Sequence, residues 1–261
     1  MSATASHPAR PEGPRGPGGP GRSGGPGTAG AGRLARPLLL AFLVAAAVDL
    51  AGLIAGIDVV HLVAKPLLMP LLAGYAAVRG GPRLLVAALL FGWGGDVFLL
   101  ADNDLAFLLG MGSFAVGHVC YLTLFGRGRG RNRGPDRDRS LGRARTPLVT
   151  AIGYGTVLAV FLVLIWPDLP AELRAPLTGY SLLLTATAWR AGVLGRYAAA
   201  GGALFLLSDA LIATGIAEWP RLPAPDFWVM LTYIAAQFLL ALGVLTAGAR
   251  GGATARPAHR P

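Results

Sequence analysis

Four fully charged residues interrupt the long apolar segments of this 261-residue chain: Asp49, Lys65, Asp96 and Asp209. Each lies in an apolar run of about 20 residues, the length at which a helix crosses the hydrocarbon core of a bilayer. Burying one ionisable side chain there costs at least about 2.5–3.5 kcal/mol on insertion scales, so such residues are usually functional. The helical rise places all four about 8–12 Å from the same side of the membrane. Three carboxyl groups and one ammonium group in one layer form a candidate catalytic centre.

The chemistry of this layer follows from its charge balance. One lysine can neutralise one carboxylate, so the other aspartates are expected to be at least partly protonated. A protonated carboxyl group near an ionised one is a general acid–base pair, as in glycosidases. Tyr180 and Gln237 lie near the same layer, and His118 lies deeper, about 20 Å from that side.

Composition limits the class of protein. Hydrophobic residues make up 54% of the chain, charged residues only 14%, and the mean hydropathy is +0.56. Average soluble domains carry about 25% charged residues, so a soluble enzyme is nearly excluded and a polytopic membrane protein is expected. The single cysteine, Cys120, excludes a disulfide framework and a cysteine-based zinc site. Neither a metal nor a cofactor is expected.

The predicted fold is all-α: a transmembrane bundle of eight helices, because open strands leave backbone groups unsatisfied in lipid. The apolar runs place the helices at 37–56, 59–79, 83–101, 105–125, 147–166, 172–190, 198–217 and 226–247. The membrane domain is therefore expected to span 37–248. Residues 1–36, rich in Pro, Gly and Arg, and residues 249–261 are expected to be disordered tails.

Arginine supplies all but one of the 23 basic residues, and its distribution predicts the orientation. Nearly all the arginines fall in the two tails, the loop 126–146 and the short loops near 80 and 191–197, whereas acidic residues dominate the alternate loops. The positive-inside rule then places both chain ends in the cytoplasm, in a multi-pass protein of the cell membrane. The Arg-rich loop 126–146 lacks the aromatic residues that stack on bases, so a topology or anionic-lipid role is favoured over nucleic-acid binding.

Several short segments, in order, resemble the YhhN family, which includes the animal lysoplasmalogenases. They are KPLLMPLLA (65–73), GWGGDVFLL (92–100), FAVGHVCYL (114–122), GALFLLSDALIA (202–213) and YIAAQ (233–237). The resemblance implies an eight-helix enzyme that hydrolyses the vinyl-ether bond of lysoplasmalogens to a fatty aldehyde and a glycerophospho-alcohol. The partners it implies are a lyso-ether phospholipid substrate and the membrane lipids, with no obligate protein partner.

The resemblance also implies roles for residues of this chain. Asp96 and Asp209 would be the catalytic pair. Lys65, His118, Tyr121, Ser208 and Gln237 match motif positions and would line the substrate pocket; Tyr180, in the same layer, and Tyr233, in the last motif, are expected there too. Asp49 matches no motif.

Simpler interpretations stand beside these. Lys65 and Asp96 would form a pair that only locks two helices, Asp49 would face a watery vestibule, and His118 would be a packing hydrogen-bond donor. A proton-coupled transporter or a non-catalytic lipid-binding protein also uses buried Asp and Lys, although transporters usually show repeats or paired broken helices. A metal-dependent hydrolase has little support, since only His118 is predicted well inside the bilayer.

Overall fold

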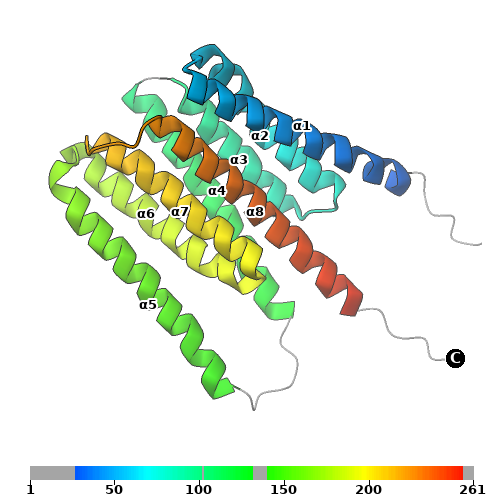
Figure 1. Cartoon of the computed structure of the whole chain (residues 1–261). Helices are drawn as coiled ribbons and strands as arrows, with labels where there is room; N and C mark the ends of the chain where they lie inside the picture. The colour runs from blue at the N-terminus through cyan, green and yellow to red at the C-terminus, as the bar shows by residue number, and fades with distance from the viewer. Residues whose placement is uncertain (1–26, 102, 132–139, 255–261) are drawn as a thin grey trace, which may run out of the picture.

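The computed structural model describes residues 27–101, 103–131 and 140–254, and these residues fold into helices without a strand (Figure 1). Eight α-helices and two 3₁₀ helices follow one another: α1 (Gly27–Ala55), α2 (Asp58–Val78), α3 (Arg83–Phe98), α4 (Asp104–Arg131), α5 (Ser140–Ile165), η1 (Trp166–Asp168), α6 (Ala171–Ala191), η2 (Gly192–Leu194), α7 (Arg196–Ile216) and α8 (Pro225–Thr254). The predicted all-α fold with eight helices is confirmed.

Several helices extend beyond the apolar runs that predicted them. Helix α1 begins at Gly27 and α8 ends at Thr254, so both enter segments expected to be tails, and α4 and α5 extend into the Arg-rich loop. Apolar runs mark the part of a helix that crosses lipid, and they do not mark where the helix begins or ends. The remaining predictions for the tails and this loop fall on residues 1–26, 132–139 and 255–261, which lie outside the described residues.

Six helices in the described part of the chain are long and apolar enough to span a membrane. The other two are α3 and α6. Helix α3 has 16 residues, about 24 Å of rise, and α6 carries Glu172, Arg174 and Arg190 near its ends. Helix α2 is continuous through Pro66 and Pro70, so neither proline breaks it. The protein is an integral membrane protein.

The helices pack mainly with their neighbours in sequence. The most extensive contacts are α7 with α8, α1 with α2, and α3 with α4. Helix α5 differs, because its main contacts are with α6 and η1 only, and Figure 1 shows it standing at one side of the bundle. The start of α1 and the end of α8 lie at the same end of the bundle (Figure 1).

Glycines allow α6, α7 and α8 to approach backbone to backbone. A Cβ atom on Gly201 would lie 2.8 Å from the carbonyl oxygen of Ala236, and one on Gly202 would lie 2.8 Å from Cα of Ala188. Real Cβ atoms do not approach other atoms this closely, so these two glycines set the spacing around α7. The close approach of helices around α7 therefore depends on residues without a side chain.

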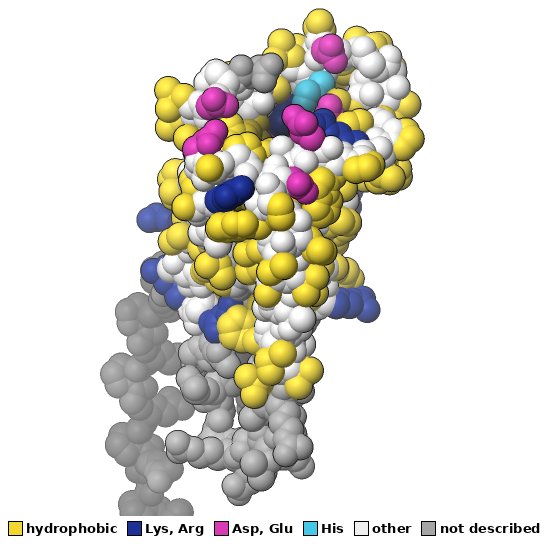
Figure 2. All heavy atoms as spheres, turned by 90° about the vertical axis from the view of Figure 1, so that its left-hand side faces the viewer, with side chains coloured by type: hydrophobic (Ala, Val, Ile, Leu, Met, Phe, Trp, Pro, Cys, Tyr) yellow, Lys and Arg dark blue, Asp and Glu magenta, His cyan; other side chains and the backbone are white. Residues whose placement is uncertain are grey.

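Charge is distributed unevenly along the bundle. Figure 2 shows the Asp and Glu side chains of the visible face gathered at one end, whereas the charged side chains toward the other end are Lys and Arg. This separation matches the asymmetry of the sequence, and the end rich in acidic residues is called the acidic end below.

Candidate active site

A cavity of about 180 Å³ lies among seven of the eight helices. Its polar wall contains Lys65 of α2, Asp96 of α3, Tyr180 of α6, Asp209 of α7 and Tyr233 of α8. The rest of the lining is mostly apolar: Leu99, Phe107, Met111, Phe114, Val157, Leu158, Phe161, Leu177, Leu184, Leu206, Ile212, Val229 and Met230 are among its residues. Polar groups at a few positions of an otherwise hydrocarbon wall are typical of sites for small amphiphilic ligands.

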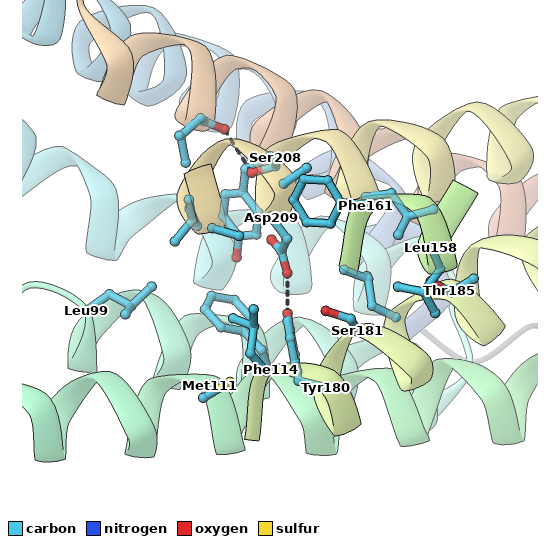
Figure 3. Close-up of a pocket in the computed structure, with 18 of the residues that line it drawn as sticks. Leu99, Met111, Phe114, Leu158, Phe161, Tyr180, Ser181, Thr185, Ser208 and Asp209 are labelled. Carbon is cyan, nitrogen blue, oxygen red and sulfur yellow. Dashed lines mark hydrogen bonds between the residues drawn. The ribbon is translucent and has the colours of Figure 1, made fainter. Parts of the chain in front are cut away.

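Asp209 projects into the middle of this cavity (Figure 3). The hydroxyl of Tyr180 donates a hydrogen bond to Asp209 Oδ2 at 2.5 Å. Leu99 and Met111 lie on one side of the carboxyl group and Leu158 and Thr185 on the other (Figure 3). The contact with Tyr180 fixes one carboxyl oxygen as an acceptor and leaves Oδ1 for a ligand.

Asp96 ends a chain of hydrogen bonds that runs through α8. Tyr121 donates to Gln237 Oε1 at 2.8 Å, Gln237 Nε2 donates to the hydroxyl oxygen of Tyr233 at 3.4 Å, and Tyr233 donates to Asp96 Oδ2 at 2.8 Å. Because the amide of Gln237 donates to the Tyr233 oxygen, the proton of Tyr233 is directed to the carboxyl group. All four side chains are almost fully buried.

Gly92 makes room for this chain. A Cβ atom at Gly92 would lie 3.1 Å from Gln237 Nε2 and 3.3 Å from Tyr233 Oη, closer than side chains normally approach. Gly92 lies one helical turn before Asp96 on α3, so the same turn that carries the carboxyl group receives its hydrogen-bond partner. Gly94 and Gly95 make room in the same way, since a Cβ atom there would lie 2.7 Å from Ser113 Oγ and 2.5 Å from the ring of Phe114.

Lys65 lies in the cavity wall without an ion pair. It is 9% exposed, and in the described part of the chain no carboxylate oxygen lies within 4.0 Å of its ammonium nitrogen. The expected direct pair with Asp96 is therefore absent, and Asp96 Oδ2 instead accepts a hydrogen bond from Tyr233. Lys65 belongs to the Asp96 side of the cavity, since α2 packs against α3.

Two other predicted residues have structural roles at this site. Ser208 lines the cavity, but its hydroxyl donates to the carbonyl oxygen of Val229 at 3.1 Å, which ties α7 to α8. His118 does not line the cavity: its ring packs edge-on against Phe205, with 4.6 Å between ring centroids, and neither ring nitrogen has a hydrogen-bond partner among the described residues. A packing role for His118 therefore fits its surroundings, although it donates no hydrogen bond.

Tyr121 and Gln237 also lie behind the cavity rather than in its wall. The structure thus brings Lys65, Asp96, Tyr180, Ser208, Asp209 and Tyr233 into one cavity wall and leaves His118, Tyr121 and Gln237 in the layer behind it.

A contact that the sequence did not predict joins the first two helices near the acidic end. His61 Nδ1 lies 2.9 Å from Asp49 Oδ1. Asp49 is completely buried, so it does not face a watery vestibule. A Cβ atom at Gly52 would lie 2.6 Å from the side chain of Val60, so this glycine allows α1 and α2 to approach closely beside the pair.

Helix α5 supplies cavity residues that no sequence motif indicated. Tyr154, Val157, Leu158 and Phe161 all line the cavity, and they lie in an apolar run that resembles any other membrane helix. No group of three or more His, Cys, Asp or Glu residues is close enough to hold a metal ion among the residues that the structure describes.

Residues 60–244 match the sequence model of the YhhN family, and this range includes Lys65, Asp96 and Asp209. The chain belongs to the YhhN family. The match begins after Asp49, so α1 lies outside the family segment. The resemblance noted in the motifs is therefore confirmed.

Proteins from animals and bacteria are similar in sequence to this chain. The chain is 33% identical to lysoplasmalogenase TMEM86B of Rattus norvegicus over 188 residues, which is 69% of this chain and 70% of the rat protein. It is 32% identical to lysoplasmalogenase TMEM86B of Homo sapiens over 180 residues, 67% of this chain and 70% of the human protein. It is 32% identical to the lysoplasmalogenase of Mycobacterium tuberculosis over 169 residues, 62% of this chain and 60% of that protein. No solved structure matches the chain significantly.

Proposed function

We propose that this protein hydrolyses the vinyl-ether bond of a lysoplasmalogen-type lipid, with Asp96 and Asp209 as the general acid–base pair. The observation that carries the proposal is one cavity that holds both carboxyl groups in a hydrocarbon wall. Such a wall accepts the alkenyl chain of a single-chain lipid, and the names of the relatives indicate the same substrate class.

The reaction requires an acid before it requires a nucleophile. A vinyl ether resists direct attack by hydroxide and is instead protonated on the β-carbon, which gives an oxocarbenium ion. Water then adds to the carbon that carries the ether oxygen. The resulting hemiacetal loses its alcohol, so one water molecule converts the substrate into a fatty aldehyde and a glycerophospho-alcohol. The cation is close in kind to the one that paired carboxylates stabilise in glycosidases.

The surroundings of the two aspartates suggest their roles. Lys65 lies on the Asp96 side of the cavity and favours an ionised carboxylate there, which would stabilise the cation and accept a proton from water. Asp209 has Tyr180 as its hydrogen-bond partner and forms no ion pair among the described residues, so it would hold the proton that is delivered to the β-carbon. We therefore assign Asp209 as the acid and Asp96 as the base.

The orientation completes the proposal. With both chain ends in the cytoplasm of a cell, the cavity would lie in the half of the membrane facing away from the cytoplasm, and a single-chain lipid would enter from the bilayer.

The direct test is product analysis. Purified protein in detergent, incubated with a panel of lyso-lipids, is expected to release a fatty aldehyde from 1-alkenyl lysolipids and none from 1-acyl or 1-alkyl analogues, as measured by mass spectrometry. Binding of the alkenyl lipid without any aldehyde would instead favour a non-catalytic lipid-binding or transport protein.

The role of the hydrogen-bond chain gives a second prediction. Tyr233→Phe keeps the ring but removes the donor to Asp96, and we expect kcat to fall about 10- to 100-fold with a smaller change in KM, because a hydrogen bond to a charged group contributes about 1.5–3 kcal/mol. Tyr75→Phe, at a buried tyrosine outside the cavity, is the matched control. An unchanged kcat in Tyr233→Phe would show that Tyr233 serves packing alone.

A further inference from the structure

The Asp49–His61 pair lies outside the catalytic cavity and has no part in the proposed chemistry. It is the one contact within 4.0 Å between a basic and an acidic side chain in the described part of the chain, and it joins α1 to α2. Asp49 is 0% exposed, whereas the side chain of His61 is 19% exposed. The second carboxyl oxygen, Asp49 Oδ2, is buried and has no hydrogen-bond partner among the described residues.

Lys65 follows His61 by four residues on α2, so the two side chains occupy neighbouring positions on one helix face. Lys65 lines the cavity, and its ammonium group lacks an ion-pair partner in the described residues. A buried charge without a partner is costly, and the usual solutions are an opposite charge or a ligand. The cavity wall therefore offers a cation that no carboxylate oxygen of the described residues contacts within 4.0 Å, in a lining that is mostly apolar.

Asp49 is a second acidic residue near this face of α2, because its partner His61 lies one turn before Lys65. His61 occupies Oδ1 of Asp49 at 2.9 Å. Asp49 forms no ion pair with Lys65, so the ammonium group is available to an anion that enters the cavity.

We propose that Lys65 binds the phosphate of a single-chain phospholipid, and that Asp49 and His61 are positioning residues that keep Lys65 free for it. The identity of the lipid rests on the proposed function. In a lyso-ether lipid the phosphate is on glycerol C3 and the vinyl ether is on C1, so an anchored phosphate would hold the ether bond a few atoms away, on the Asp96 side of the cavity. The subsite predicts preference for phosphate-bearing substrates over alkenyl glycerols.

The experiment measures binding with ligands that cannot be cleaved. The probes are a saturated 1-O-alkyl lysophosphatidylcholine and the 1-O-alkylglycerol of the same chain length, titrated into the full-length protein in detergent. The wild type is expected to bind the phospholipid at least about tenfold more tightly than the alkylglycerol. Inorganic phosphate and glycerophosphocholine are added as competitors. If the ligand is a phosphate-bearing lipid, neither competitor should displace the alkyl lysophospholipid at a comparable concentration.

Lys65 is tested first. Lys65→Gln is expected to lose most of the preference for the phospholipid, and Lys65→Arg, which keeps the charge, is expected to retain most of it. Arg79→Gln, an exposed cation at the other end of α2, is the matched control. An unchanged preference in Lys65→Gln overturns the proposal.

The positioning pair is tested by rescue. His61→Leu releases Asp49 to pair with Lys65, so the preference for the phospholipid should fall about tenfold. Asp49→Asn in the same protein removes the competing carboxylate and should restore the preference. Asp58→Asn, at an exposed acid on α2, is the control. A double variant no better than His61→Leu contradicts the role of the pair, because a purely structural loss would not be rescued.

This experiment separates the two proposals. The ligands in this experiment are not cleaved. If the protein prefers the phospholipid but releases no aldehyde from alkenyl lipids, the phosphate subsite is supported and the proposed reaction is rejected. If the protein releases aldehyde equally well from alkenyl glycerol and from alkenyl phospholipid, the proposed reaction is supported and the phosphate subsite is rejected.

Discussion

Asp96→Asn and Asp209→Asn are each expected to lower kcat for aldehyde release at least 100-fold. Asparagine has nearly the same shape and its carbonyl oxygen still accepts the hydrogen bond from Tyr233 or Tyr180, so the fold should persist. Asparagine neither donates a proton to carbon nor accepts one from water, and general acid–base catalysis typically contributes about 10²- to 10⁴-fold. Aldehyde is measured by mass spectrometry at saturating alkenyl lysolipid.

The control for this prediction is Asp226→Asn, at an exposed acid in the first turn of α8, which should keep wild-type activity. Binding of the uncleavable alkyl lysolipid by both inactive variants would show that the cavity is intact. Full activity in both variants would reject the carboxyl pair as the catalytic machinery, and a large loss in only one would leave a single catalytic carboxyl group.

Gly201→Val is expected to destabilise the helix bundle more than either Asp→Asn substitution or Tyr233→Phe. A Cβ atom at this position would lie 2.8 Å from both the carbonyl oxygen of Ala236 and the amide nitrogen of Leu240, which are backbone atoms that cannot rotate away. Helices α7 and α8 would have to separate along their largest interface, and overpacking of this kind typically costs about 1–3 kcal/mol or more. Asp209 on α7 and Tyr233 on α8 would then move apart.

Thermal unfolding in detergent tests this prediction through a lower Tm of Gly201→Val. Gly112→Val, in α4 where an added Cβ meets nothing within 4 Å, is the matched control and should keep a Tm near that of the wild type. Equal Tm values for the two variants would mean that the α7–α8 interface adjusts to the extra side chain.

The helices could be predicted from the sequence because length and hydropathy are local properties. Eight apolar runs correspond to eight helices, with central positions that agree with the structure. The ends were less predictable, as α1 begins at Gly27 rather than near 37, since no apolar pattern marks where a helix ends in water. The short α3 shows the same limit, because its apolar run continues past its last residue, Phe98.

The residues of the candidate site could be predicted from their types, but the hydrogen-bond partner of each residue could not. Charges buried in apolar runs identified Asp96, Asp209 and Lys65, and the structure places all three in one cavity wall. Partners are decided by packing between helices far apart in sequence. Tyr233 reaches Asp96 across 137 positions, whereas Lys65, the partner expected from charge, forms no direct pair with it.

The pairing of Asp49 with His61 shows a different limit. Both residues lie near the α1–α2 turn, but only the close approach of the two helices at Gly52 makes them partners. His118 matches a motif position, and the sequence left open whether it lines the pocket or packs between helices; it packs among aromatic rings behind the cavity. A residue's type indicates what it can do, whereas the neighbouring helices determine what it contacts.

The sparse packing of α5 determines which substrate concentration governs the reaction rate. Only 6% of its membrane span is buried, against 56% for the span in α8, although Val157, Leu158 and Phe161 form part of the cavity wall. One wall of the cavity is thus a single helix with lipid on its other side. For an enzyme of this shape, the substrate is supplied in two dimensions, and its mole fraction in the bilayer or micelle replaces its concentration in the buffer. Adding inert lipid at a constant amount of substrate then slows the reaction by dilution within the surface.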